Sequence, residues 1–213
     1  MKKAILFDID GTILDTRDFV FNALRHSLTT HGYPYPTEKN IKKATGSPLT
    51  EFYKVLMPGA DVSVFVKAHV EFQENNFRTI KIFPKAEETL KSLKNDGFFL
   101  AAVSNRTRKS LLRLLQYAGV HDCFDAVVSP DDVTNPKPHQ EHLLFALKKL
   151  KVKPENSYMV GDMAQDILAG RNAKVKTVGV TYGFLGQDIA KYGPDYLIDN
   201  IEDLLKILRS ANI

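Results

Sequence analysis

Short runs of apolar residues, each about as long as a β-strand, recur along the chain. We assign six of them to strands, at residues 4–7, 98–103, 126–128, 157–160, 177–180 and 196–198. Several of the segments between them repeat apolar residues at helical spacing, and the last such segment, residues 201–208, follows the i, i+3, i+4, i+7 pattern. Strands that are apolar on both faces and alternate with helices are typical of a parallel sheet covered on both sides. We therefore predict a doubly wound parallel α/β sheet.

One long segment interrupts this alternation. After the first run, no second strand is expected until residue 98, and the intervening pattern is helical. One helix is predicted to begin near Phe19 and to end near His31, and another to follow Ser47 as its N-cap, with Pro48 at the first helical position. We interpret residues 16–80 as a small all-helical cap domain inserted after the first strand. Residues 1–15 and 81–213 then form the α/β core.

The composition is that of an ordinary globular protein. The chain has 213 residues, of which 44% are hydrophobic and 25% charged. Its single cysteine, Cys123, excludes an internal disulfide framework and a zinc site built from cysteines. Asp8 and Asp10 interrupt the apolar stretch behind the basic start, so a signal peptide is not expected. With no apolar run of about 20 residues, we expect a cytoplasmic protein without a membrane partner.

The positive charge is spread evenly along the chain. The net charge is +4, from 29 basic and 25 acidic residues. There is no basic tail and no dense basic stripe, which argues against a nucleic-acid partner. We expect a monomer or homodimer that acts on a small phosphorylated metabolite, for reasons that follow from the polar residues.

Polar residues gather where the predicted strands end. Asp8 and Asp10 follow the first strand, Ser104 follows the second, and Asp162 follows the strand at 157–160. Lys137 lies in the loop after the strand at 126–128. Open α/β sheets bind ligands just beyond the carboxyl ends of their strands, so these groups should converge. Carboxylates at close range repel one another and need a counter-ion, for which an oxygen-bound divalent cation such as Mg²⁺ is suited. The pattern favours phosphoryl transfer.

Each of these segments also has a plainer explanation when it is taken singly. Asp8 and Asp10 can form a turn, Ser104 or Asp162 can cap a helix, and Lys137 can be an exposed loop lysine. What favours a catalytic site is their combination, in this order, at the ends of successive strands.

The combination resembles the four motifs of the haloacid dehalogenase (HAD) superfamily. The matching residues are Asp8-Ile9-Asp10-Gly11-Thr12, Ser104, Lys137, and Gly161-Asp162 with Asp166. The resemblance covers nearly the whole chain, is closest to phosphoglycolate phosphatase-like members, and implies a Rossmann-like core. The insertion at 16–80 looks like the helical cap of that superfamily.

This resemblance implies a role for each motif residue. Asp8 would be the nucleophile that forms an aspartyl-phosphate. Asp10 would be the general acid and then the base for the hydrolytic water. Ser104 and Lys137 would bind the phosphoryl group, with further substrate contacts from the neighbouring residues Gly11, Thr12 and Asn105.

The same resemblance implies a Mg²⁺ cofactor. Its ligands would be the carboxylates of Asp8 and Asp162 and the backbone carbonyl of Asp10, while Asp166 would orient waters or Lys137 from the second shell. In the cap, Gly46 and Ser47 resemble the loop that faces the substrate in phosphoglycolate-type phosphatases.

Several functions remain compatible with this reading. The leading one is a Mg²⁺-dependent phosphatase for a small organic phosphate monoester such as 2-phosphoglycolate. A β-phosphoglucomutase-like enzyme is an alternative. There is no arginine between Arg25 and Arg78 to hold a second phosphate, but Lys42, Lys43 or Lys54 could substitute as point charges. An inorganic pyrophosphatase, a nucleotidase and a non-catalytic protein on the same fold are the others.

Overall fold

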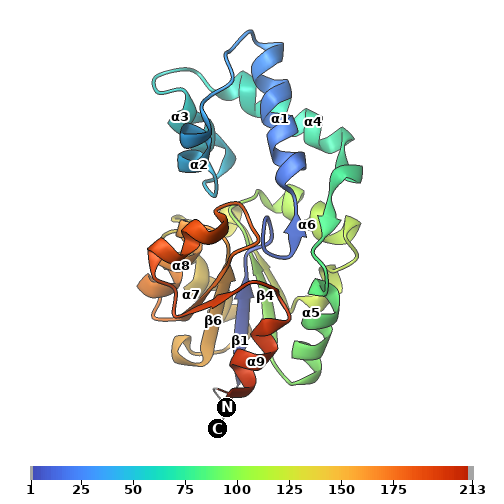
Figure 1. Cartoon of the computed structure of the whole chain (residues 1–213), viewed down its shortest axis with the longest axis vertical. Coiled ribbons are helices and arrows are strands. Elements are labelled where there is room, and N and C mark those ends of the chain that lie inside the picture. The colour runs from blue at the N-terminus through green and yellow to red at the C-terminus, as the bar shows by residue number, and fades with distance from the viewer. Residues whose placement is uncertain (1, 211–213) are drawn as a thin grey trace.

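A parallel sheet lies at the centre of the computed structural model, which describes residues 2–210 (Figure 1). Its strands are β1 (Ala4–Phe7), β4 (Phe99–Val103), β5 (Ala126–Val128), β6 (Ser157–Gly161), β7 (Lys176–Val180) and β8 (Tyr196–Ile198). They are arranged in the order β5-β4-β1-β6-β7-β8, and each neighbouring pair is parallel. The predicted fold class and all six strands are confirmed, with bounds within one residue.

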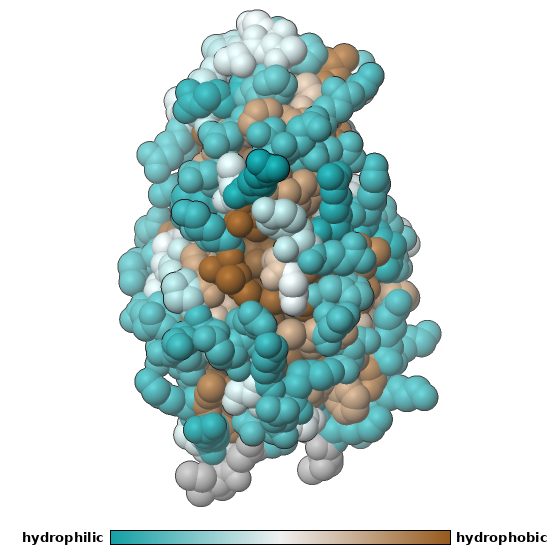
Figure 2. Space-filling view, turned by 90° about the vertical axis from the view of Figure 1, so that its right-hand side faces the viewer, coloured by the Kyte–Doolittle hydropathy of each residue, from teal (hydrophilic) through white to brown (hydrophobic). Residues whose placement is uncertain are grey.

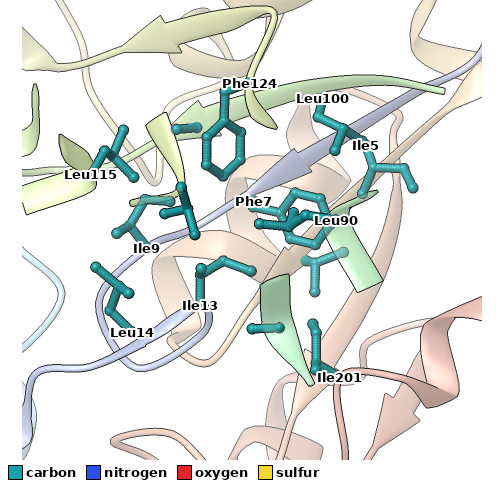
Figure 3. Packing of buried hydrophobic residues seen from close by; sticks show 14 of the residues in the cluster. Ile5, Phe7, Ile9, Ile13, Leu14, Leu90, Leu100, Leu115, Phe124 and Ile201 are labelled. Atoms are coloured by element: carbon teal, nitrogen blue, oxygen red, sulfur yellow. The ribbon is translucent and has the colours of Figure 1, made fainter. Parts of the chain in front are cut away.

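Helices cover both faces of this sheet. On one face lie α5 (Ala86–Asn95), α6 (Arg108–Tyr117) and α9 (Asp203–Ser210), and on the other lie α7 (Glu141–Leu150) and α8 (Ala164–Asn172). Side chains of β1 alternate between the two layers, because successive residues of a strand point to opposite faces. Ile5 and Phe7 pack with Leu90 and Leu100 in the larger cluster (Figure 3). Leu6 packs in the other cluster, with residues of α7 and α8.

Four helices stand above the carboxyl ends of the strands (Figure 1). They are α1 (Arg17–Thr30), α2 (Glu38–Ala44), α3 (Leu49–Leu56) and α4 (Ser63–Asn75), followed by the short 3₁₀ helix η1 (Phe77–Thr79). They enclose a hydrophobic cluster of their own, which includes Leu24, Leu28, Phe52 and Tyr53. These helices fall within the segment 16–80 that was predicted as a cap, and we call them the cap below.

Two details of the cap differ from the prediction. Helix α2 was not predicted, because only Ile41 and Ala44 of its seven residues are buried and apolar. Ser47 is not the N-cap of α3, since Pro48 occupies that position and no side chain caps the helix. The ring of Pro48 fixes its φ at −53°, and the chain is extended there before α3 begins. Ser47 therefore lies in the preceding turn.

A two-stranded antiparallel sheet joins the cap to the core. It consists of β2 (Leu14–Asp15) and β3 (Lys81–Ile82), which pair Leu14 with Ile82 and Asp15 with Lys81. The two chain crossings therefore lie side by side, which is the arrangement that a hinge requires.

Short 3₁₀ helices complete the core. They are η2 (His121–Cys123), η3 (Pro130–Asp132), η4 (Pro154–Asn156) and η5 (Gly186–Tyr192). Within residues 2–210, no helix is both long enough and apolar enough to cross a membrane.

Candidate active site

The polar residues singled out in the sequence meet at the carboxyl edge of the sheet. Asp8 directly follows β1, Ser104 follows β4 and Asp162 follows β6, and all three are buried. The chain runs from β1 to β4 on one side and later returns to β6 on the other. Strand order thus reverses around β1, and such switch points are where open α/β sheets form ligand sites.

Lys137 is the central cation of the site. Its ammonium group, in a side chain only 2% exposed, donates to Asp8 Oδ1 at 2.8 Å, to Asp166 Oδ1 at 2.7 Å and to the carbonyl of Val103 at 2.6 Å. An ammonium has three N–H donors, so all of them are used. Burial by itself disfavours the charged form, but Asp166 and Asp8 outweigh it and raise the pKa of Lys137.

Three buried carboxylates form a cluster beside this lysine. Asp8, Asp162 and Asp166 each place an oxygen within 4.8 Å of the other two. Burial, followed by the charges of Asp8 and Asp166, raises the pKa of Asp162 well above its usual value. Burial also raises the pKa of Asp8 to about 7, although Lys137 opposes the shift. One lysine does not neutralise three carboxylates. The cluster offers only oxygen ligands, which fit a hard divalent cation.

Asp162 is held rigidly by its surroundings. Its Oδ2 accepts from the backbone N–H of Phe184 at 2.6 Å, and its Oδ1 accepts from the Thr12 hydroxyl at 3.3 Å. Gly11 has a φ of +79°, and a Cβ on it would lie 2.3 Å from Asp162 Oδ2. Gly11 and Thr12, which were predicted to bind substrate, thus lie against Asp162, and neither is among the residues that line the cavity described below.

Asp166 positions Lys137 from the start of α8. One carboxylate oxygen accepts from Lys137, and the other accepts from the backbone N–H of Met163 at 3.0 Å. Gly161 lets this side chain approach the strand, because a Cβ there would lie 2.3 Å from Asp166 Cγ.

The carboxylate of Asp10 faces an arginine that the sequence analysis did not single out. Arg106 Nη2 donates to Asp10 Oδ1 at 2.7 Å and Nε donates to Oδ2 at 3.0 Å, so the pair is bidentate. Burial alone would raise the pKa of Asp10, but the charge and hydrogen bonds of Arg106 outweigh it and lower that pKa. The position of Arg106, two residues after Ser104 at a strand end, was the signal that could have found it.

Two core side chains hold the cap loop at residues 45–46. Asn105 Nδ2 donates to the carbonyl of Gly46 at 2.7 Å and to that of Lys137 at 2.9 Å. Gln165 Nε2 donates to the carbonyl of Thr45 at 3.1 Å. Gly46 has a φ of +88°, and a Cβ there would lie 2.7 Å from Gln165 Oε1. Gly46, which was predicted to face the substrate, therefore also packs closely against Gln165.

A cavity of about 140 Å³ lies between Asp8 and the cap. The core side is mostly polar, with Asp8, Asp10, Ser104, Asn105, Arg106, Thr107, Ser110, Lys137 and Asp166. The cap side mixes apolar residues with uncharged polar ones, namely Val20, Thr45, Gly46, Ser47, Leu49, Phe52, His69, Val70 and Gln73. Figure 2 shows one face of the molecule, on which hydrophobic residues gather in a hollow near mid-height. Ser47 thus lines the cavity even though it does not cap α3.

Two buried histidines lie close to the site and are neutral. His69 Nδ1 is 3.0 Å from the Tyr53 hydroxyl, and His142 Nδ1 accepts from the backbone N–H of Lys137 at 3.2 Å. Burial lowers the pKa of each to about 3, with a smaller contribution from Arg106 for His69 and from Lys137 for His142.

These histidines predict a loss of stability in acid. The unfolded chain takes up a proton at each histidine below about pH 6.5, whereas the folded protein does so only near pH 3. His142 should therefore lower the free energy of unfolding by about 2 kcal/mol between pH 6.5 and pH 5. Urea unfolding of wild type and His142→Gln at both pH values measures this difference, and equal pH slopes for the two proteins would contradict it.

The chain belongs to the haloacid dehalogenase-like hydrolase family, whose pattern it matches over residues 5–180. It is 34% identical, over 96% of its length and 95% of the relative's, to the pyrophosphatase PpaX of Halalkalibacterium halodurans. The family membership predicted from the four motifs is confirmed, and with it the expectation that the chain is a HAD-type hydrolase.

Solved structures share the fold along the whole chain. A protein from Haemophilus somnus 129PT, described as a predicted phosphoglycolate phosphatase, has a TM-score of 0.88 at 24% identity, with 97% of this chain and 98% of that chain covered. A protein from Thermotoga maritima, described as a β-phosphoglucomutase, has a TM-score of 0.75 at 27% identity, with 99% of both chains covered.

Proposed function

We propose that the protein is a Mg²⁺-dependent phosphatase that hydrolyses a small phosphate compound through an aspartyl-phosphate on Asp8. The observation that carries this proposal is the position of Asp8, which is buried beyond β1, lines the cavity, is bonded to Lys137 and is clustered with Asp162 and Asp166. The phosphatase names of the relatives support the same class of reaction.

In the first step, a carboxylate oxygen of Asp8 attacks phosphorus and the bond to the leaving oxygen breaks. Lys137, which is bonded to Asp8, and Ser104, which lines the same cavity, stabilise the phosphoryl oxygens. Asp10 gives its proton to the leaving oxygen. The carboxylates of Asp8 and Asp162 and the backbone carbonyl of Asp10 would hold Mg²⁺, which would reduce the repulsion between the Asp8 carboxylate and the phosphate dianion.

In the second step, water attacks the phosphorus of the aspartyl-phosphate and Asp10 takes a proton from it, which releases phosphate and restores Asp8. The Arg106 pair holds Asp10 as a carboxylate, the form that acts as a base. Protonation of Asp10 for the first step requires a weaker contact with Arg106.

Removal of the metal should stop the reaction. Excess EDTA should abolish phosphate release and added Mg²⁺ should restore it, because the carboxylate cluster repels an anionic substrate without a cation. A coupled assay for released phosphate measures the effect. Undiminished turnover in excess chelator would contradict the proposal, and Mg²⁺-dependent protection against thermal unfolding gives a second readout.

The substrate proposed first is a small organic phosphate such as 2-phosphoglycolate, and the second candidate is inorganic pyrophosphate. The second is favoured by the name of the Halalkalibacterium halodurans relative. The mutase alternative lacks a cap cation, because the described cap residues that line the cavity include no lysine or arginine. A panel with 2-phosphoglycolate, pyrophosphate, a nucleoside monophosphate and β-glucose 1-phosphate separates these functions. A sugar bisphosphate requirement with isomer formation would indicate a mutase.

The cap residues that line the cavity should select among substrates. Ser47 and Leu49 contact the space above Asp8 without touching the carboxylate cluster. Ser47→Ala and Leu49→Ala should therefore change the preference among phosphate compounds by about 1–3 kcal/mol in kcat/KM, with unaltered Mg²⁺ dependence. The exposed cap variant Val64→Ala is the control. If the panel profiles merely scale by a common factor, these positions have no selective role.

A further inference from the structure

Apart from Lys137, which faces the phosphoryl group in the proposed mechanism, the cavity contains very little positive charge that a substrate could use. Among its described lining residues, the only lysine is Lys137 and the only arginine is Arg106. The three N–H donors of Lys137 are bonded to Asp8, Asp166 and the Val103 carbonyl. The cap contributes apolar surface, together with uncharged groups such as His69 and Gln73.

Arg106 reaches across the cavity from the core to the cap. Besides its two bonds to Asp10, its Nη1 donates to Gln73 Oε1 of α4 at 2.8 Å and to the Ser110 hydroxyl at 3.0 Å. A guanidinium has five N–H donors, and these contacts use four of them. One Nη2 hydrogen remains for a ligand, and the side chain is only 11% exposed.

The place of Arg106 relative to the reacting atoms is fixed through Asp10. As proposed above, the Asp10 carboxyl exchanges a proton with the leaving oxygen, which requires a contact of about 2.6–3.2 Å. The guanidinium lies 2.7 and 3.0 Å beyond the same carboxyl group. The guanidinium is therefore close to the group that is attached to the leaving oxygen.

We propose that Arg106, together with Gln73, binds a second acidic group on the leaving part of the substrate and is the residue that selects such substrates. The group is a carboxylate or a second phosphate within about two bonds of the leaving oxygen. This inference rests on the proposed function and names its substrate class, phosphate compounds that carry two acidic groups.

An arginine fits this role better than other residues of the cavity. A carboxylate or phosphate buried under a closed cap needs a charged partner to offset its lost hydration, and the planar guanidinium binds both groups through paired N–H donors. Gln73, in the cap helix α4, accepts from Nη1 and so holds the guanidinium in place. The acidic group is therefore bound while α4 lies over the site. The acidic group accepts from the remaining Nη2 hydrogen and competes with Asp10 for the Nε and Nη2 donors of Arg106.

Binding of non-hydrolysable phosphonates tests the proposal without turnover. Calorimetry in Mg²⁺ buffer compares 3-phosphonopropionate, which carries a carboxylate, and methylenediphosphonate, which carries a second phosphonate, with propylphosphonate, which carries neither. The proteins are wild type, Arg106→Gln, Arg106→Lys and the control Arg108→Gln, whose side chain pairs with Asp132 away from the cavity. Circular dichroism melting verifies that each variant folds.

Wild type and Arg108→Gln should bind at least one of the two diacids at least about tenfold more tightly than propylphosphonate. Arg106→Gln should abolish this preference and Arg106→Lys should retain part of it. Whichever diacid is preferred identifies the second group as carboxylate or phosphate. Equal affinity of wild type for all three ligands, or an equal loss for all three in Arg106→Gln, would overturn the proposal.

Turnover separates this inference from the proposed function. The ratio of kcat/KM for 2-phosphoglycolate to that for 2-hydroxyethyl phosphate, and the corresponding ratio for pyrophosphate to methyl phosphate, are measured in wild type and Arg106→Gln. If at least one of these ratios is about tenfold or more lower in Arg106→Gln than in wild type, the assignment is supported. If kcat/KM falls equally for both substrates of each pair, Arg106 acts only on Asp10. If nothing is hydrolysed while the binding preference persists, the phosphatase proposal fails and the acid-binding role of Arg106 stands.

Discussion

Asp8→Asn should lower turnover by at least about 10⁴-fold, because an amide cannot form the aspartyl-phosphate. The substitution keeps the shape of the side chain, which is 9% exposed and sits directly beyond β1. It also removes one of the two carboxylates that bind Lys137. The loss should appear in kcat with every substrate of the panel, since the nucleophile is common to all of them.

The fold should survive this change. Burial raises the pKa of Asp8, and the charges of Asp166 and Asp10 add to the shift; Asp8 in turn raises the pKa of Asp162, so loss of its charge relieves repulsion within the cluster. Urea unfolding and a phosphate-release assay on the same preparations measure both effects. Asp96→Asn, at an exposed position, is the control. Residual activity within tenfold of wild type would reject Asp8 as the nucleophile.

Lys137→Met should reduce both stability and activity. The side chain is almost fully buried and is shared by Asp8 and Asp166. Without it, two buried carboxylates lose their cation, and breaking a buried ion pair in this way costs about 3–5 kcal/mol. The phosphoryl group loses its nearest cation as well, which should lower kcat/KM by about 10²–10³-fold.

Denaturant unfolding, with and without Mg²⁺, measures the stability loss. Mg²⁺ should restore part of the stability of Lys137→Met, because a cation bound at the carboxylate cluster takes over some of the missing charge. Lys94→Met is the control, since Lys94 pairs with Asp125 with a side chain that is 35% exposed. Such a surface pair contributes about 0–1 kcal/mol. Similar stability losses in the two variants would mean that the Lys137 pairs are no more important than a surface pair.

The sheet could be predicted because its strands carry a strong local signal. Each of the six is a short apolar run, and β1 is buried on both faces. By contrast, β2 and β3 have two residues each, which is too few for any periodicity. They form because the two connections between core and cap lie side by side and pair with each other. Helix α2 was missed for a similar reason, since it buries little apolar surface.

The site could be predicted in part from topology. Parallel strands end at one edge, so side chains that follow β1, β4 and β6 must meet there, and Asp8, Ser104 and Asp162 do so. No such rule applies to Arg106 and Gln73, which are separated by 33 positions and belong to the core and the cap. Their contact depends on how the cap is placed over the sheet.

The sequence by itself determined the fold class, and it predicted the helical segment at 16–80 and the candidate site residues that follow the strands. These follow from periodicity and from the order of motifs, which are local properties of the chain. Only the tertiary structure decided which charges face one another. Arg106 pairs with Asp10, Gly46 meets Gln165, and Gly11 and Thr12 support Asp162, because each contact joins segments that only packing brings together.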